Sequence, residues 1–175
     1  MAYEKGNKVD KKHYWLTPQY LFDKLNKEFE FDFDPCPYPK PDDFDGLQAE
    51  WGESNYVNPP FGSYKDRETN KKYGPTAWAK KAIKEFKKGK RIVLVYPVDK
   101  WILMILEAGA NVTNLKDIHW QAIEDNTNGP GTGRHIACFI LEPPNFKRTT
   151  NKKLIGPNEQ PFKKSDTQHK INFNE

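Results

Sequence analysis

The chain has 175 residues, enough for one domain with a hydrophobic core, and its 14% aromatic residues exclude disorder over most of its length. Its two cysteines are too few for a disulfide scaffold, and its four histidines lack metal-binding spacing, so no metal site is predicted. The net charge of +4 fits a protein with one anionic partner. A charged N-terminus, without any long apolar run, predicts a cytoplasmic protein that does not enter a membrane.

The first predicted element is a helix within residues 15–29. Residues 1–12 are polar and form an N-terminal arm. Thr17 is a candidate N-cap of the helix, and Pro18 occupies its first position. The apolar residues that share one face of this helix are Leu21, Phe22, Leu25 and Phe29.

Two short strands and two loops follow this helix. The stretch "EFDFD" alternates in polarity and predicts a strand that ends at Asp34. Four prolines between Pro35 and Pro41 exclude a regular element there. The stretch "SNYVNPPF" predicts a second strand, which stops at Asn58, and the polar residues 62–76 form a loop.

A second helix is predicted over residues 77–88, with Thr76 as its N-cap and Gly89 at its end. The residues expected on its inward face are Trp78, Ala82, Ile83 and Phe86. Its many lysines then occupy the opposite face, which we expect to be solvated.

The remaining pattern predicts one buried strand, one helix and three further strands. The stretch "RIVLVY" is almost continuously apolar, as in a strand buried on both sides of a parallel sheet. A helix closes at Gly109. The strands are expected at 111–115, 117–123 and 134–141, the last two joined as an antiparallel hairpin. Residues 147–175 form a polar tail on the surface.

This order of elements predicts an α/β domain over residues 13–146, with a Rossmann-like, mostly parallel sheet and an antiparallel C-terminal hairpin. Ligands of such sheets bind beyond the carboxyl ends of the strands. Asp34 and Asn58 both lie at such ends, so we expect the loops that follow them to face one crevice.

The tetrad Asn58, Pro59, Pro60 and Phe61 has the chemistry to hold a planar amine. Prolines carry no N–H, so this backbone offers only acceptors, to which the Asn58 side chain adds another oxygen. Two acceptors can bind the two amine hydrogens, while the Phe61 ring stacks on the planar group. Such binding orients the nitrogen lone pair toward an electrophile.

Residues 15–97 resemble the phage-type family of DNA N6-adenine methyltransferases. The resemblance rests on "WLTPQYLFDKL", "FDFDPCP", "DGLQAEWGESNYVNPPF" and "WAKKAIKEFKKGKRIVLVYP". It implies an abbreviated class I methyltransferase fold, and S-adenosylmethionine as the methyl donor. The cofactor-binding residues that it implies are Trp15, Thr17, Pro18, Asp34, Pro35, Cys36, Asp45 and Asn58.

Three of these assignments have a structural alternative. Asp34 can accept hydrogen bonds from the amino group of the cofactor, or can cap its own loop. Asp45 can hold the ribose hydroxyls, or can belong to a turn before Gly46. Trp15 can line the cofactor pocket, or can pack in the core.

Double-stranded DNA is the partner that the resemblance implies, with the target base flipped out of the duplex. The loop after the tetrad mixes aromatic and cationic residues and is the main candidate for DNA binding. A Gly-rich turn over residues 126–133 either reaches DNA or is only a flexible hairpin. The candidate DNA-binding residues are Tyr64, Lys65, Arg67, Lys71, Lys72 and Arg134.

Other functions fit the same tetrad. The substrate amine could belong to cytosine N4, to adenine in RNA or to a glutamine amide. The chain could also be a catalytically inactive nucleic-acid-binding module. The motif leaves the oligomeric state open between a monomer and a weak dimer.

Overall fold

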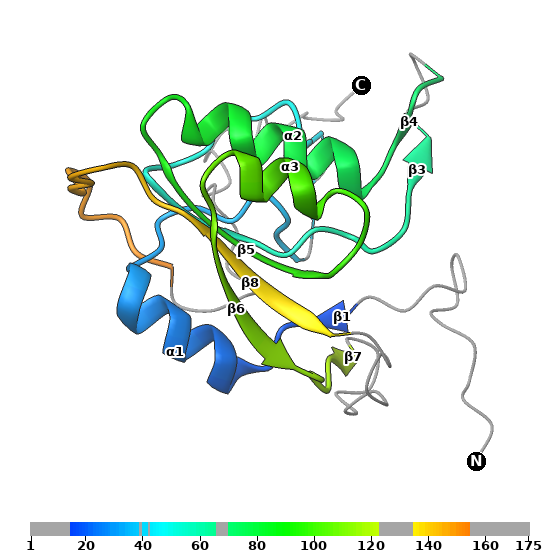
Figure 1. The fold of residues 1–175 in the computed structure, drawn as a ribbon, viewed down its shortest axis with the longest axis horizontal. Coiled ribbons are helices and arrows are strands. Elements are labelled where there is room, and N and C mark those ends of the chain that lie inside the picture. The colour runs from blue at the N-terminus through cyan, green and yellow to red at the C-terminus, as the bar shows by residue number, and fades with distance from the viewer. Residues whose placement is uncertain (1–14, 39, 42, 66–69, 123–134, 155–175) are drawn as a thin grey trace, which may run out of the picture.

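The computed structural model describes residues 15–38, 40–41, 43–65, 70–122 and 135–154 (Figure 1). Their fold is α/β, with three helices and a mixed four-stranded sheet in the order β2-β5-β8-β6. The strands of this sheet are β2 (Ser54–Val57), β5 (Arg91–Pro97), β8 (Ile136–Leu141) and β6 (Asn111–Lys116).

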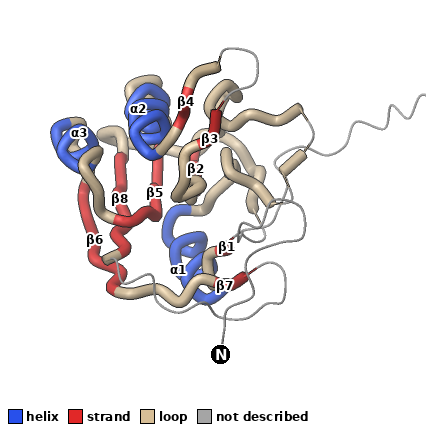
Figure 2. Tube along the Cα trace, turned by 90° about the vertical axis from the view of Figure 1, so that its right-hand side faces the viewer, coloured by secondary structure: helices blue, strands red, loops and turns tan. Residues whose placement is uncertain are grey.

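Helices cover both faces of the sheet. The helices are α1 (Gln19–Phe29), α2 (Pro75–Phe86) and α3 (Ile102–Glu107). One core cluster joins α2 and α3 to Ile92 and Leu94 of β5, and a second joins α1 to Val93 and Val95. Neighbouring residues of a strand point to opposite faces, so α1 lies on the face opposite to α2 and α3 (Figures 1 and 2). The prediction that β5 is buried on both sides is confirmed, since Ile92 to Tyr96 are all buried.

The expected predominance of parallel pairs is wrong for this sheet. Only β2 and β5 pair in parallel among its named strands, whereas β8 is antiparallel to both β5 and β6. A further parallel bridge joins Phe33 to Asn55, so residues 31–34 extend the sheet beyond β2 without forming a full strand. The buried Asp32 carboxylate contributes here, because it accepts hydrogen bonds from the backbone of Glu53 and Ser54 at the start of β2.

The predicted hairpin between residues 117–123 and 134–141 is also wrong in its pairing. β7 (Gln121–Ala122) pairs instead with β1 (Trp15–Leu16), in a separate two-stranded sheet. Five of the six residues of β8 are buried, so this strand gains more by pairing on both edges inside the main sheet. Sequence periodicity identifies such a strand but does not identify its neighbours.

Both predicted N-caps are wrong by one or two residues. Pro18 is the N-cap of α1, and its carbonyl accepts the first hydrogen bonds of the helix from Leu21 and Phe22. Gly74 precedes α2, which starts with Pro75 at its first position. Proline suits that position because the missing N–H has no partner there in any helix. The hydroxyl of Thr17 is therefore available for another role.

A short hairpin follows the tetrad within the predicted polar loop. β3 (Tyr64–Lys65) and β4 (Lys72–Tyr73) pair in antiparallel orientation. Figure 1 shows this hairpin projecting from the body of the protein, beyond the start of α2.

The chain remains packed beyond residue 146, although we expected a surface tail from residue 147. Leu154 is buried in the cluster of α1, its N–H donates to the Phe31 carbonyl, and its carbonyl accepts from Asn26. The backbone of Thr149 and Thr150 donates to Glu53. Residues 147–154 thus fasten α1 to the edge of the sheet.

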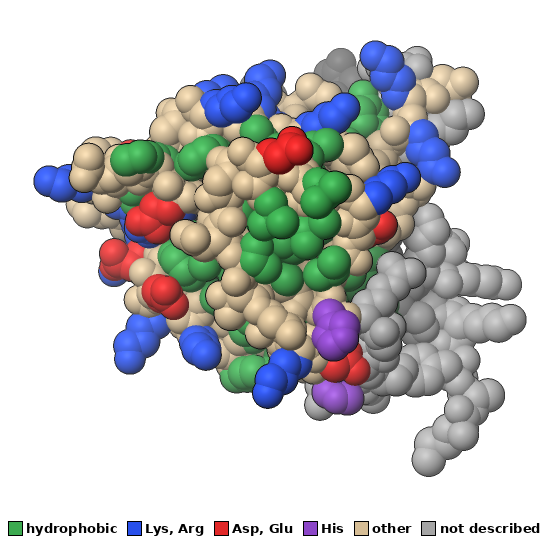
Figure 3. Space-filling model, viewed as in Figure 1, with side chains coloured by type: hydrophobic (Ala, Val, Ile, Leu, Met, Phe, Trp, Pro, Cys, Tyr) green, Lys and Arg blue, Asp and Glu red, His purple; other side chains and the backbone are tan. Residues whose placement is uncertain are grey.

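The surface carries basic and hydrophobic regions. Figure 3 shows lysine and arginine side chains along the edge that carries α2 and the β3–β4 hairpin. The same view shows hydrophobic side chains in the middle of this face, where α3 exposes Leu103 and Leu106. No helix within the described ranges has the length and hydrophobicity needed to span a membrane.

Candidate active site at the carboxyl end of the sheet

Asp34 and Asn58 directly follow two neighbouring parallel segments of the sheet. The N–H of Tyr56 in β2 donates to the carbonyl of Phe33, which fixes the register of these segments. Parallel segments present their carboxyl ends on the same side. The predicted proximity of the two loops therefore has a structural basis.

The side chain of Asn58 is held by Thr17. Its Nδ2 donates to Thr17 Oγ1 at 3.1 Å, and the same hydroxyl is hydrogen-bonded to the buried Tyr56 hydroxyl. Both nitrogen and oxygen of the Asn58 amide are thus fixed in direction. The Oδ1 atom is buried and has no hydrogen-bond partner in the described part of the chain. A buried acceptor in this state is available to a ligand.

The remaining tetrad residues differ in their availability. The Tyr96 hydroxyl donates to the Pro60 carbonyl at 2.6 Å, which anchors the end of the tetrad to β5. The Pro59 carbonyl accepts no hydrogen bond from any described residue. Free acceptors at Asn58 and Pro59 are what the predicted amine-binding chemistry requires.

Phe61 is half-buried against two other aromatic rings. Its ring meets Tyr96 edge-on with a centroid separation of 5.5 Å, and Trp120 with a separation of 5.2 Å. A hollow of about 10 Å³ lies beside it, lined by Phe61, Pro75, Tyr96, Pro97 and Asp99. This space accommodates about one water molecule. A planar ligand can stack on Phe61 only after this ring moves.

Asp34 is a buried carboxyl group without a cationic partner among the described residues. Burial raises its pKa to about 8, although a hydrogen bond from the Cys36 N–H opposes the shift. That bond, 2.7 Å from Cys36 N to Asp34 Oδ1, shows that Asp34 does cap its own loop. Asp34 also lies close enough to Tyr56 to affect its pKa, which burial raises first and the Asp34 charge raises further.

The loop after Asp34 packs tightly through Gly46. A Cβ atom at Gly46 would lie 1.9 Å from the Pro35 carbonyl oxygen, so only glycine fits this close approach. Asp45 accepts the Leu47 N–H through its side chain at 2.9 Å, the arrangement expected of a turn residue. The loop therefore returns to the end of the strand that carries Asp34.

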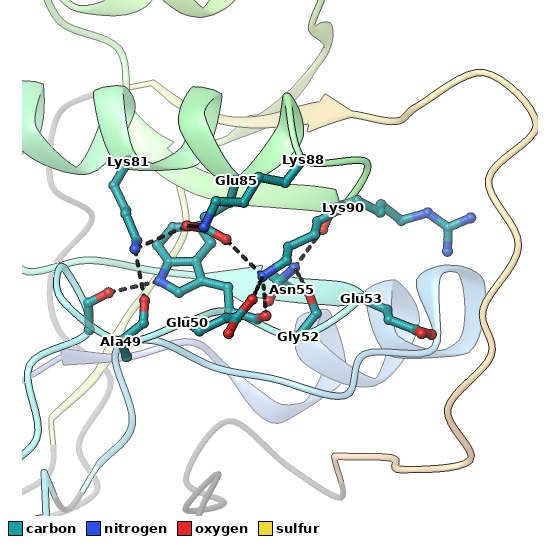
Figure 4. Close-up of polar contacts among 12 residues, drawn as sticks. Ala49, Glu50, Gly52, Glu53, Asn55, Lys81, Glu85, Lys88 and Lys90 are labelled. Carbon is teal, nitrogen blue, oxygen red and sulfur yellow. Dashed lines mark hydrogen bonds and ion pairs between the residues drawn. The ribbon is translucent and has the colours of Figure 1, made fainter.

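A buried charge network fastens this loop to α2. Figure 4 shows Lys81, Lys88 and Lys90 converging on Glu85, which is completely buried. Burial tends to raise the pKa of Glu85, but hydrogen bonds from the three lysines lower it to about 2.

Two of these lysines also hold the loop itself. Lys81 donates to the Ala49 carbonyl, and Lys90 donates to the Trp51 carbonyl. The expectation that the lysines of this region are all solvated is wrong for Lys81 and Lys90, whose side chains are largely buried. Ile83 and Phe86 are half-buried, while Glu85 takes an inward position.

The other predicted site residues are distributed as follows. Thr17 lies at the tetrad, Pro35 and Cys36 lie beside Asp34, and Pro18 starts α1. Trp15 packs against the core cluster of α1, which agrees with the alternative that it has a packing role. Lys71 and Lys72 are exposed at the β3–β4 hairpin, which also contains Tyr64 and Lys65. Arg67 and Arg134 lie outside the described residues.

Four residues of the site were not predicted: Tyr56, Glu85, Tyr96 and Trp120. Tyr96 lies in a strand that we expected only to be buried, and its hydroxyl holds Pro60, whereas Tyr56 lies in the short strand before the tetrad, and its hydroxyl holds Thr17. For Tyr96, a polar atom on a mostly apolar strand was the available signal. Trp120 gave no such signal, since its distance from Phe61 depends on pairing between remote segments.

Comparison of the chain with protein-family models, with curated proteins and with solved structures finds no match.

Proposed function

We propose that this protein transfers a methyl group from S-adenosylmethionine to the N6 amine of adenine in DNA. The observation that carries the proposal is the Asn58 Oδ1 atom, a buried acceptor without a partner at the carboxyl end of β2. Leaving such an atom unpaired costs roughly 1–3 kcal/mol, and an amine hydrogen of the substrate removes this cost.

The chain positions the substrate amine for attack. Asn58 Oδ1 and the Pro59 carbonyl accept its two hydrogens, while Thr17 keeps the Asn58 side chain in place. Phe61 supplies the stacking face once it turns away from Trp120. When bound, S-adenosylmethionine would supply an electrophilic methyl group on a sulfonium sulfur, and that sulfur would keep the C–S bonding electrons as the leaving group. The amine nitrogen gains a positive charge and becomes acidic only as it bonds to the methyl carbon, and it then loses one proton to water, so no strong base is needed before transfer.

Asp34 suits the amino-acid end of this cofactor. A buried carboxyl group with a pKa of about 8 is held without a cation, and an ammonium group would supply the missing charge. Its Oδ1 already accepts the Cys36 N–H, which fixes the direction of the carboxyl group. Asp45 is the candidate for the ribose hydroxyls, through the oxygen that does not serve its turn.

DNA is the proposed partner because of the basic edge beside the tetrad. Lys71 and Lys72 are exposed on a projecting hairpin that begins three residues after Phe61. Cations on such a hairpin can contact phosphates while the target base occupies the site.

The experiment is the transfer of a labelled methyl group to unmethylated plasmid, followed by digestion to nucleosides. We expect label in N6-methyl-2′-deoxyadenosine, and no label in this nucleoside with Asn58→Ala. Asn58→Asp is the matched variant, because it keeps the acceptor oxygens and leaves the Thr17 hydroxyl to donate. Label in N4-methyl-2′-deoxycytidine would identify cytosine, and not adenine, as the substrate base. No transfer and no cofactor binding by calorimetry would support the inactive nucleic-acid-binding module instead.

A further inference from the structure

Trp120 places a buried hydrogen-bond donor beside the tetrad. Five buried side-chain nitrogen and oxygen atoms among the described residues have no hydrogen-bond partner. They are Asn55 Oδ1, Asn58 Oδ1, Trp101 Nε1, Trp120 Nε1 and Arg148 Nε. Asn58 precedes Phe61 by three residues, and Trp120 packs on the Phe61 ring. One unpaired acceptor therefore lies within the tetrad, and one unpaired donor belongs to a residue whose ring contacts the last residue of the tetrad.

The strand pairing brings Trp120 to the same place independently. Trp15 pairs with Ala122 and Leu16 with Gln121, so Trp120 is next in register opposite Thr17. Thr17 is the residue that holds the Asn58 amide. Trp120 is only 1% exposed, and burying an indole N–H without a partner is unfavourable.

Other tryptophans of the chain show that this arrangement is not general. The Trp51 Nε1 atom donates to the Gly46 carbonyl at 2.7 Å and is satisfied within the protein. Trp101 also has an unpaired Nε1, but it belongs to the cluster of α2 and α3 on the opposite face of the sheet. Trp120 alone of these three contacts the Phe61 ring in the described structure.

We propose that the Trp120 indole N–H donates to the ring nitrogen adjacent to the amine of the target base. This inference rests on the proposed function and deepens it. On the Watson–Crick edge, adenine and cytosine carry an acceptor ring nitrogen next to the exocyclic amine, whereas the ring nitrogen at the centre of that edge carries a hydrogen in guanine and thymine. Asn58 then accepts from the amine and Trp120 donates to the neighbouring ring nitrogen, so the pair selects the Watson–Crick edge of adenine or cytosine over that of guanine or thymine.

Access to this edge depends on Phe61. Both Asn58 Oδ1 and Trp120 Nε1 are shielded from solvent, and the hollow beside Phe61 is too small for a base. Phe61 is the half-buried contact of Trp120, so its rotation away from Trp120 opens the space. The base then replaces one aromatic contact of Trp120 and satisfies its N–H.

The kinetic test compares adenine with 1-deazaadenine, in which the ring nitrogen is replaced by a C–H group. The target is placed opposite an abasic site, so that the two bases do not differ in pairing. We expect the wild type to prefer adenine on the order of tenfold in kcat/KM, and Trp120→Phe to lose this preference while keeping the ring packing. Trp101→Phe, which removes an equally buried unpaired N–H, should keep it. An unchanged preference in Trp120→Phe would overturn the proposal but leave methyl transfer standing.

A second readout does not require activity. The chain has five tryptophans, and the indole N–H resonance that disappears in Trp120→Phe identifies Trp120. In the wild type this resonance should shift on adding an adenine oligonucleotide and not on adding its 1-deazaadenine counterpart. Equal shifts would refute the contact. A selective shift without methyl transfer would keep the contact and disprove the enzymatic function.

Discussion

The Thr17 hydroxyl accepts a hydrogen bond from the amide of Asn58, 41 residues further along the chain, and is also bonded to Tyr56. This three-residue contact joins the segment before α1 to the end of β2. It leaves the Asn58 oxygen, and not its nitrogen, free for a ligand. The polarity of the site is thus set by a residue outside the tetrad.

Thr17→Val should lower methyl transfer while leaving the fold intact. Valine keeps the shape of threonine but removes the hydroxyl, so the Asn58 amide loses its fixed direction. We expect kcat to fall about tenfold and the free energy of unfolding to fall by about 1–3 kcal/mol, because the Tyr56 hydroxyl also loses its partner. Labelled transfer and urea unfolding measure the two effects.

Tyr56→Phe provides the control for this change. It removes the other half of the contact and keeps the bond from Asn58 to Thr17, so it should reduce stability more than transfer. A Thr17→Val enzyme with full activity would show that Thr17 is only structural.

Asp34 should make the protein less stable as the pH rises. Its pKa is about 3.8 in the unfolded chain and about 8 in the fold, chiefly because of burial. The folded state therefore binds the Asp34 proton more tightly than the unfolded chain does. The stability that this proton contributes is complete below pH 3.8 and is lost as the pH rises to about 8. Asp34→Asn should remove this pH dependence. Near pH 8 the free energy of unfolding of the variant should then gain on the order of a few kcal/mol relative to the wild type.

The same carboxyl group predicts proton release when the cofactor binds. At pH 7 Asp34 is mostly protonated, and an ammonium group favours its ionised form. Calorimetry in buffers of different ionisation enthalpy should detect release of close to one proton, and Asp34→Asn should abolish it. Binding without proton release would place the ammonium elsewhere.

Glu85→Gln should destabilise the protein at neutral pH. The substitution leaves Lys81 and Lys90, both largely buried, without their common carboxylate. We expect a loss of roughly 2–4 kcal/mol by urea unfolding, while the exposed Glu107→Gln has little effect.

The decrease of the free energy of unfolding at acid pH, the acid limb of the pH–stability curve, tests the same network. Glu85 has a lowered pKa in the fold, so its contribution is present above pH 4.5 and is lost as the pH falls to about 2. Glu85→Gln should flatten this limb. An equally steep limb in the variant would assign the acid sensitivity to other carboxylates.

Lys71→Gln and Lys72→Gln should weaken DNA binding without impairing cofactor binding. Each lysine that contacts a phosphate contributes about 0.9 to the slope of log K against log salt. A filter-binding titration at several salt concentrations should show that slope falling in the double variant. Lys84→Gln, on the exposed face of α2, is the control. An unchanged slope would remove the β3–β4 hairpin from the DNA surface.

Local pattern was sufficient for the elements that bury a simple apolar face. The face of α1, the doubly buried β5 and the end of α3 near Gly109 all follow from periodicity and from glycine with positive φ. The tetrad was also located correctly after β2, because Pro59 and Pro60 cannot continue a strand.

Only the tertiary structure decided the partners of these elements. The pairing of β8 with β5 and β6 depends on which edges remain free after the sheet assembles. The roles of Thr17 and Trp120 depend on residues more than thirty positions away, and the lysines around Glu85 reach the distant carbonyls of Ala49 and Trp51. The sequence determined where an amine-binding motif could stand, whereas burial and long-range hydrogen bonds decided which of its oxygens stays free, since those quantities exist only once distant segments exclude water together.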